Sequence, residues 1–145
     1  MCDNTSASSN AIKPNFQIYN TGTTTINLSD IKVRYYYTDD LKKSQNASVY
    51  WVSSGISTLT NKIVKMETQK TNADSYDEFG FTSGAGTLAP GKCVEIHGVL
   101  NYTDWANYTQ TNDYSFNGSA TSYIDNTKFT GYINNNLAWG NEPLN

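Results

Sequence analysis

Apolar and polar residues alternate at every second position along much of this chain, and helical periodicity is nearly absent. The clearest case is residues 31–38, whose odd positions are aliphatic or aromatic and whose even positions are mostly polar. Since successive side chains of a strand point to opposite faces, this segment predicts a β-strand with one buried face. Further strands are expected at residues 15–20, 48–52, 63–67, 77–82, 92–100, 129–133 and 137–139.

Turn signals separate these segments. Asn134-Asn135-Asn136 joins the last two, and asparagine tolerates the positive φ that a tight hairpin requires. Ala89-Pro90-Gly91 marks another turn. Short strands at a spacing of roughly 8–12 residues, with turns between them, predict an all-β fold. We therefore expect a β-sandwich of jelly-roll topology with two antiparallel sheets.

Length and charge restrict the classes of function. A chain of 145 residues corresponds to one domain, and with 16% charged residues and a net charge of −3 it lacks a basic face for nucleic acid or an anionic membrane. No run approaches the roughly 18 apolar residues of a membrane helix, and no signal peptide is visible. We expect residues 1–145 to be a single module of a larger protein, with residues 1–3 as a linker remnant.

Two cysteines and one histidine limit metal and nucleophile chemistry. Cys93 lies in the alternating segment 92–96, which indicates a small buried side chain. A disulfide with Cys2 requires the first strand to run beside that segment, and the sequence leaves this open. No CxxC pair is present and His97 is the only histidine. The sequence therefore excludes ordinary zinc sites, and it excludes a Ser-His or Cys-His nucleophile system that does not use His97.

Two loop segments offer oxygen ligands for a cation. Thr38-Asp39-Asp40 follows the clearest strand, and the second segment is residues 109–113. Carboxylate, amide and carbonyl oxygens are the ligands that calcium prefers. Capping of turns by the same side chains is the alternative, and the pattern alone leaves both open.

The carboxylates show no pattern typical of a glycosidase. Such an enzyme needs two carboxyl groups about 5–9.5 Å apart. Asp77 and Glu78 are adjacent on an expected strand, so their side chains point to opposite faces. We therefore expect a protein that is not an enzyme.

Aromatic residues carry the strongest functional signal. Those that occur among small polar residues are Tyr50, Trp51, Tyr102, Trp105 and Tyr108. Aromatic planes stack on the apolar faces of sugar rings, and amide and hydroxyl neighbours suit the sugar hydroxyls. Trp105 stands between Asp104 and Ala106 with no apolar run around it, which indicates a role in binding. Packing within strands is expected for Tyr19, Tyr35, Tyr37 and Trp139.

Six segments resemble a family 3 carbohydrate-binding module, the cellulose-binding β-sandwich of scaffoldins, cellulases and related bacterial surface proteins. They are NFQIYNTGTTTINLSDIKVRYYYT, KIVKM, TNADSY, GTLAPGKCVEIHG, DWANYTQTNDYSF and GYINNNLAWGNEP, in the family's order and within about residues 4–143. The resemblance implies about nine strands and one structural calcium ion. The ligands it implies are Thr38, Asp40, Thr109, Asn112 and Asp113.

The resemblance also implies a flat binding surface for crystalline cellulose. Trp105 falls on the tryptophan of this surface, and Asn4, Asn10 and Ser119 fall on polar anchors.

Several other positions depart from the family. Val99 replaces an arginine, Ser53-Ser54 replaces an Asp-His pair, His97 replaces an anchor glutamine, and the loop between Val52 and Lys62 is short. Loss of several contacts, each worth about 1 kcal/mol or more, weakens binding by orders of magnitude. The residues expected to substitute for the missing contacts are Trp51, Tyr50 or Tyr102, and His97 is expected at the binding surface in the place of the anchor glutamine.

A second surface of the family is a shallow groove on the opposite sheet. Its positions are matched by Arg34, Tyr36, Tyr76, Glu78 and Tyr114. Alternation places Arg34 and Tyr36 on the outer side of their strand, where exposure is expected. The groove is implied to take a single glycan chain or a linker peptide, and an Arg-Glu pair that only stabilises the sheet is the alternative.

These patterns lead to a non-catalytic, calcium-containing, monomeric module that binds cellulose or a related β-linked plant cell-wall polysaccharide. It is expected outside the cell or on a bacterial surface, without direct contact to membrane or nucleic acid. The parent protein could be a scaffoldin, a cellulase or a biomass sensor. The first alternative is a module that has lost binding to crystalline cellulose and acts by packing on a neighbouring domain or linker, or by binding a single glycan chain in the shallow groove. A small glycosidase or lyase is the second alternative.

Overall fold

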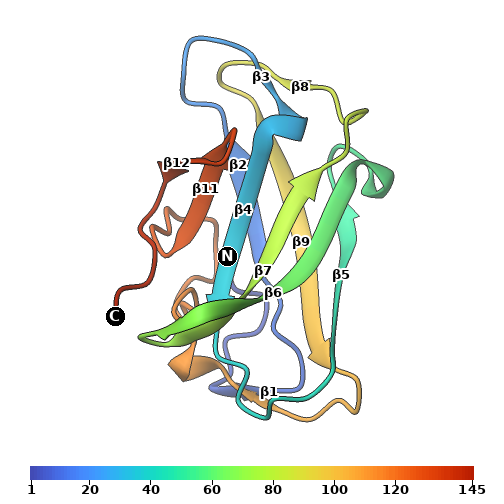
Figure 1. The fold of residues 1–145 in the computed structure, drawn as a ribbon. Coiled ribbons are helices and arrows are strands. Elements are labelled where there is room, and N and C mark those ends of the chain that lie inside the picture. Colours follow the sequence, from blue (N-terminus) through green and yellow to red (C-terminus); the bar gives the residue numbers. More distant parts are fainter.

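Two antiparallel sheets that lie face to face form the body of the protein (Figure 1). The structure, a computed structural model, describes all of residues 1–145. Its strands are β1 (Ser8–Ser9), β2 (Asn15–Tyr19), β3 (Ile26–Asn27), β4 (Ile31–Tyr37), β5 (Gln45–Val52), β6 (Leu59–Lys70), β7 (Ala73–Phe81), β8 (Thr87–Leu88), β9 (Cys93–Tyr102), β10 (Tyr108–Thr109), β11 (Phe129–Ile133) and β12 (Asn136–Trp139). One sheet has the order β12-β11-β4-β7-β6 and the other the order β2-β9-β5.

The predicted jelly-roll sandwich is confirmed. All eight strands expected from alternation are present, and the four others (β1, β3, β8 and β10) have two residues each, too few to show a pattern. These short strands form two further pairs, β1-β10 and β3-β8. The helices are short 3-10 turns at Leu28–Asp30, Ile56–Thr58 and Gln110–Asn112, and none is long and apolar enough to cross a membrane.

The core lies between the two sheets and follows the alternation of their strands. Odd positions of β4, such as Val33, and even positions of β9, such as Ile96, belong to one cluster of sixteen buried residues. Phe16 of β2 meets Phe79 of β7 edge to face, with ring centroids 5.0 Å apart. Each such side chain contributes about 2 kcal/mol by leaving water.

The predicted turns have the expected backbone. Asn134 and Asn135 have φ values of 50° and 63°, so asparagine provides the left-handed conformation of the β11–β12 hairpin. Gly91 has φ 72° in the turn that precedes β9.

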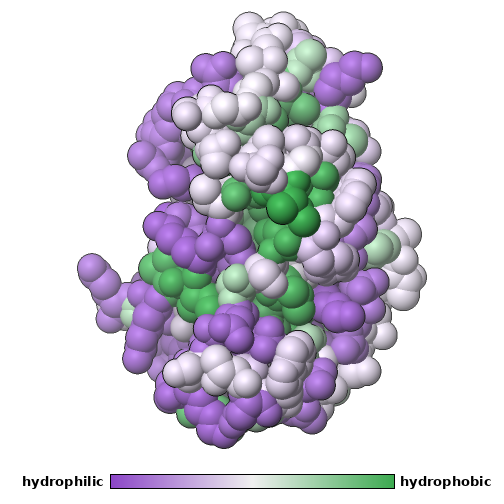
Figure 2. All heavy atoms as spheres, turned by 90° about the vertical axis from the view of Figure 1, so that its right-hand side faces the viewer, coloured by the Kyte–Doolittle hydropathy of each residue, from purple (hydrophilic) through white to green (hydrophobic).

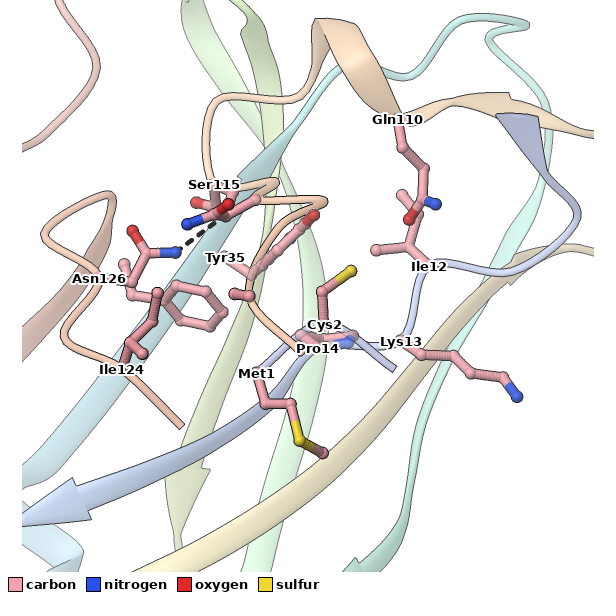
Figure 3. Close-up of a pocket in the computed structure, with 13 residues that line it drawn as sticks. Met1, Cys2, Ile12, Lys13, Pro14, Tyr35, Gln110, Ser115, Ile124 and Asn126 are labelled. Carbon is pink, nitrogen blue, oxygen red and sulfur yellow. Dashed lines mark hydrogen bonds between the residues drawn. The ribbon is translucent and has the colours of Figure 1, made fainter. Parts of the chain in front are cut away.

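The N-terminal residues are packed against the domain. The amino group of Met1 donates to the Asn15 carbonyl at 2.8 Å, and the Cys2 amide donates to the Ala120 carbonyl at 2.8 Å. In Figure 3, Cys2 lies beside Pro14 at the edge of a small cavity of about 20 Å³, which is room for about one water molecule. Residues 1 and 2 thus fold with the module, although a linker remnant was expected here.

The two cysteines are free. Cys2 is paired with Pro14 and Cys93 with Tyr19, which places them at opposite ends of β2. Five residues of strand separate these ends by about 17 Å, far beyond the reach of a disulfide. Cys93 is exposed, so the prediction of a buried residue is wrong: Val94 and Ile96 point inward and Cys93 points outward.

The two sides of the sandwich differ. On the β5 side, hydrophobic atoms gather in the middle of the face and polar atoms surround them (Figure 2). There β5 contacts β6, and Val49 and Ile63 pack on the core. At the other side the five-stranded sheet ends in β11 and β12, while the three-stranded sheet ends at β2. The two sheets therefore contact each other along the β5–β6 edge, whereas at the opposite edge β11 and β12 extend beyond β2.

Candidate functional site

Trp105 is an exposed tryptophan in a constrained loop. It follows β9, and 57% of its surface is accessible. Its φ is 58°, a left-handed conformation that is an outlier for a bulky residue. Its amide donates to the Tyr102 carbonyl at 2.9 Å, and the neighbouring Asp104 carboxylate accepts from Lys43 at 2.9 Å. A large apolar side chain held in solvent at a cost of about 1–3 kcal/mol of backbone strain indicates a functional role.

A second exposed aromatic group lies on β5, next to His97 of β9. The register of β5 and β9 shifts between Val49 and Trp51. The consecutive residues Tyr50 and Trp51 are consequently both exposed, where regular alternation would bury one of them. Their rings lie 5.6 Å and 4.9 Å from the His97 ring. Trp51 and His97 were both expected at the binding surface, and the structure brings them together.

Glu95 anchors this aromatic group. Its carboxylate accepts hydrogen bonds from Tyr123 at 2.6 Å, from Gln17 at 2.8 Å and from His97 at 2.6 Å. These bonds lower the pKa of Glu95 to about 2, with the Tyr123 hydroxyl as the largest cause. Sequence reasoning missed Gln17 and Tyr123. Gln17 could have been found from the pairing of β2 with β9, which places it opposite Glu95. Tyr123 lies in a loop, and no pattern in the sequence indicates its contact with Glu95.

The two exposed aromatic groups lie at different points along β9: Tyr50 and Trp51 of β5 lie beside His97 in its middle, and Trp105 follows its C-terminal end. Tyr102 is five positions after His97, which corresponds to about 17 Å along a strand. Trp105 lies beyond that point in the chain. A glycan that contacts both groups therefore has to be several sugar rings long.

Other predicted binding residues have different surroundings. Asn10 and Ser119 are exposed, whereas Asn4 is half-buried and donates to Ser9 Oγ at 2.7 Å. Tyr102 is fully buried, and its ring stacks on Tyr108 with centroids 4.1 Å apart. The prediction that Tyr102 contacts a glycan is therefore wrong.

The five predicted calcium ligands come together at one end of the sandwich. Thr38 follows β4, and its amide donates to the Asp113 carboxylate at 2.8 Å while its hydroxyl donates to the Asn112 carbonyl at 2.9 Å. The Asp40 carboxylate accepts from the Asn112 side chain at 2.8 Å and from the Thr109 amide at 2.7 Å. We refer to Thr38, Asp40, Thr109, Asn112 and Asp113 as the calcium cluster.

The calcium cluster contains buried oxygens without partners. Asn112 Oδ1 and Asp113 Oδ2 are both buried and accept no hydrogen bond. Burial raises the pKa of Asp113 to about 8, and the nearby Asp40 charge adds to this rise. Orphaned oxygens beside two carboxylates suit a divalent cation that prefers oxygen ligands. The residues present therefore fit calcium.

The groove residues form one bonded network on the outer face of the five-stranded sheet. Arg34 pairs with Glu78 at 2.9 Å, and its guanidinium lies 4.4 Å from the ring centres of both Tyr76 and Tyr132. Burial alone would raise the pKa of Glu78, but Arg34 and then Lys62 lower it below its usual value. The Arg34–Glu78 pair thus connects β4 to β7 on the outer surface of this sheet.

Tyr36 is buried, contrary to the expected exposure. It is on the outer side of β4, but its ring packs edge-on against Tyr76 and Tyr114, and its hydroxyl bonds to Thr130 at 3.0 Å. Only 2% of its surface is accessible, so a ligand in the groove cannot reach it.

The C-terminal segment lies against the same face. The Tyr114 hydroxyl donates to the Asn141 carbonyl at 3.0 Å, and the Tyr132 hydroxyl donates to the Glu142 carboxylate. Further along, the Thr71 amide donates to the Leu144 carbonyl at 2.9 Å. One end of the groove is thus in contact with an extended segment of the chain itself.

Comparison with known proteins agrees with this fold. The family model described as cellulose binding domain matches residues 1–140. The Exoglucanase-2 of Thermoclostridium stercorarium is 53% identical over 140 residues, which cover 97% of this chain and 15% of that protein. The chain belongs to the family 3 carbohydrate-binding modules. Carbohydrate binding fits this membership.

Solved structures of this family superimpose closely on the module. The CBM3b of the major scaffoldin subunit ScaA from Acetivibrio cellulolyticus is 45% identical with a TM-score of 0.94, over 98% of this chain and 93% of that one. The biomass-sensoring module of the Rsgi2 protein from Clostridium thermocellum is 38% identical with the same TM-score and the same coverage. The module spans between 8% and 27% of the lengths of the curated relatives that it matches.

Proposed function

We propose that the module binds cellulose or a related β-linked plant cell-wall polysaccharide through Trp105. The observation that carries this proposal is the exposure of Trp105 on a left-handed backbone. An indole ring in this position offers a flat apolar plane to the apolar face of a sugar ring. Tyr50, Trp51 and His97 provide a second contact, held in place by Glu95.

We propose that the calcium cluster holds one structural calcium ion. Asp40 and Asp113 supply negative charge, and Thr38, Thr109 and Asn112 supply neutral oxygens. The ion would neutralise the buried carboxylate of Asp113 and give its free oxygen a partner. It would also connect the end of β4 to the segment that follows β10.

We propose that the module is non-catalytic and works within a larger extracellular or cell-surface protein. Asp77 is buried between the sheets and Glu78 is bonded to Arg34 on the outer face, so these two neighbours do not form a catalytic pair. The names of relatives, which include an exoglucanase and cellulosomal scaffolding proteins, favour a parent protein that acts on or assembles near plant polysaccharide.

The groove supports a second candidate function, the docking of an extended peptide. The specific observation is that Asn141 and Glu142 already contact Tyr114 and Tyr132. A neighbouring linker would extend these contacts toward Arg34. This surface then fixes the module relative to its parent protein and leaves cellulose binding to Trp105.

The test is a pull-down on insoluble cellulose. Trp105→Ala is expected to abolish most of the retention, and Leu137→Ala is the control, because Leu137 is also an exposed apolar side chain but lies on β12 of the five-stranded sheet. Arg34→Ala is expected to leave retention unchanged. Full retention of Trp105→Ala on cellulose would refute the assignment of the binding surface. Loss of retention only in Arg34→Ala would indicate that the groove binds cellulose instead.

A further inference from the structure

A large cleft opens between β2 and the β11–β12 hairpin. It has a volume of about 520 Å³, which lies within the range of roughly 300–1,000 Å³ typical of ligand pockets. It exists because β11 and β12 extend the five-stranded sheet past β2, the last strand of the opposite sheet. Trp105, Trp51, His97 and the calcium cluster do not line this cleft, whereas Tyr132 of the groove network, and Gln17 and Tyr123, which bond to Glu95, lie along its lining.

The inner face of β11 lines the cleft, and a glycine widens it. Thr130 and Tyr132 bond to Tyr36 on the outer face, so Gly131 and Ile133 point to the inner face. A Cβ atom on Gly131 would meet nothing closer than Trp139 Cβ at 3.5 Å, an ordinary contact. A glycine within a strand marks a place where another molecule can approach closely. A side chain would fit at position 131, and its absence leaves room for a ligand.

The deep part of the cleft is apolar. It reaches the core residues Ile31, Val33 and Leu88. A sugar ring placed at this depth would leave its hydroxyl groups without hydrogen-bond partners, at a cost of about 1–3 kcal/mol for each buried group. The inner end of the cleft therefore suits a ring without polar groups.

Two exposed aromatic residues flank the mouth. Tyr19 and Trp139 have 57% and 48% of their surfaces accessible, and both line the cleft. The Trp139 indole donates to the Asn126 carbonyl at 3.3 Å, and the Tyr19 hydroxyl donates to Gln17 at 3.1 Å. These bonds hold both rings in place beside the opening, where they can stack on a bound molecule.

The polar groups around the cleft are mainly neutral amides and hydroxyls, as in Asn20, Thr21 and Thr24. Asp125 is the one charged side chain that lines it, and no lysine or arginine does. The amino group of Met1 also reaches the lining but is bonded to the Asn15 carbonyl. An anionic ligand would thus find no cationic side chain, and a neutral ligand fits best.

We propose that this cleft binds neutral aryl glycosides, with the aryl ring between the sheets and the hydroxylated part at the rim near Tyr19 and Trp139. The aryl ring meets the apolar depth beside Gly131, and the sugar meets the amides and hydroxyls of the mouth. This site is separate from Trp105 and does not depend on the proposed binding of cellulose.

The test uses phenyl β-D-glucopyranoside in calorimetric or NMR titrations, with methyl β-D-glucopyranoside as the ligand that lacks the ring. The wild-type module is expected to bind the phenyl glycoside saturably and the methyl glycoside at least tenfold more weakly. Gly131→Ile, which fills the cleft with a side chain that favours strands, is expected to abolish binding. Ile56→Ala is the control, because Ile56 is exposed and lines neither this cleft nor any site assigned above, and it is expected to bind as the wild type does.

Trp139→Ala provides an independent variant at the mouth, since it changes an exposed side chain and leaves the core intact. It is expected to weaken binding of the phenyl glycoside about fivefold or more. Absence of saturable binding by the wild type would overturn the proposal, as would equal binding of both glycosides. Unchanged binding in Trp139→Ala would overturn it too, even if Gly131→Ile failed to fold.

Discussion

Asp77 and Asn61 form a buried pair that should make the stability of the module depend on pH. Asp77 is fully buried on the inner face of β7, and the Asn61 amide donates to its Oδ1 atom. Asp77 Oδ2 and Asn61 Oδ1 are both buried without a partner. Both atoms are acceptors while Asp77 is ionised. One proton on Asp77 Oδ2 would allow it to donate to Asn61 Oδ1, and the two side chains would then satisfy each other.

The electrostatics of Asp77 favour this protonated form. Burial raises the pKa of Asp77 from 3.8 to about 8, although the Asn61 hydrogen bond opposes the rise. Because the folded state binds this proton more tightly than the unfolded state, the contribution to stability is complete below about pH 4. It is lost progressively as the pH rises toward 8, at about 1.4 kcal/mol per pH unit. By pH 7 the loss amounts to about 4 kcal/mol.

Asp77→Asn removes this dependence and keeps the shape of the pair, since an amide can donate to Asn61 Oδ1 at every pH. Urea titrations followed by tryptophan fluorescence, at saturating calcium, give the free energy of unfolding at each pH. We expect the variant to gain about 4 kcal/mol relative to the wild type between pH 4 and pH 7. Glu67→Gln is the control, because it removes the same charge from an exposed position. A difference between Asp77→Asn and wild type that stays constant over this range would refute the reasoning.

Removal of calcium with EGTA is expected to lower the Tm of the wild type by several degrees, because a ligand bound only to the folded state stabilises it. In Asp113→Ala, EGTA should no longer lower the Tm. A wild-type Tm that is the same with and without EGTA would contradict the calcium proposal. Trp51→Ala is expected to weaken binding to cellulose about fivefold, the equivalent of about 1 kcal/mol of stacking. The loss of cellulose affinity should thus be smaller than in Trp105→Ala. Unchanged affinity would show that Trp51 does not contact cellulose.

Alternation was sufficient to predict the long strands. Residues 31–38 alternate cleanly because one face of β4 packs on the core and the other bears Arg34 and the groove tyrosines. The sequence pattern indicated two oxygen-rich segments, and the resemblance to the family named the five residues of the calcium cluster, which the structure brings together. Each segment carries its own ligands, so the fold had only to bring two loops together.

Burial by distant parts of the chain could not be predicted in the same way. Tyr36 is at an even position of β4, where alternation predicts an outward side chain, but Tyr76, Tyr114 and the strand β11 cover it. Trp139 lies on β12, which no strand of the opposite sheet covers. For Tyr102 a signal did exist: it continues the even, inward positions of β9, and the strand runs two residues past its expected end.

The loop that presents Trp105 depends on the calcium cluster for one of its two attachments. At its start the Trp105 amide is bonded to Tyr102, whose hydroxyl is fixed in turn by the Asp39 carboxylate at 2.8 Å. At its end, four positions later, the Thr109 amide is bonded to the Asp40 carboxylate. A left-handed backbone at Trp105 persists only if both ends are held, because release of either would let the strain relax. The same short acidic segment after β4 thus bonds to both ends of the loop, so the proposed calcium site and the proposed glycan-binding residue share one structural support.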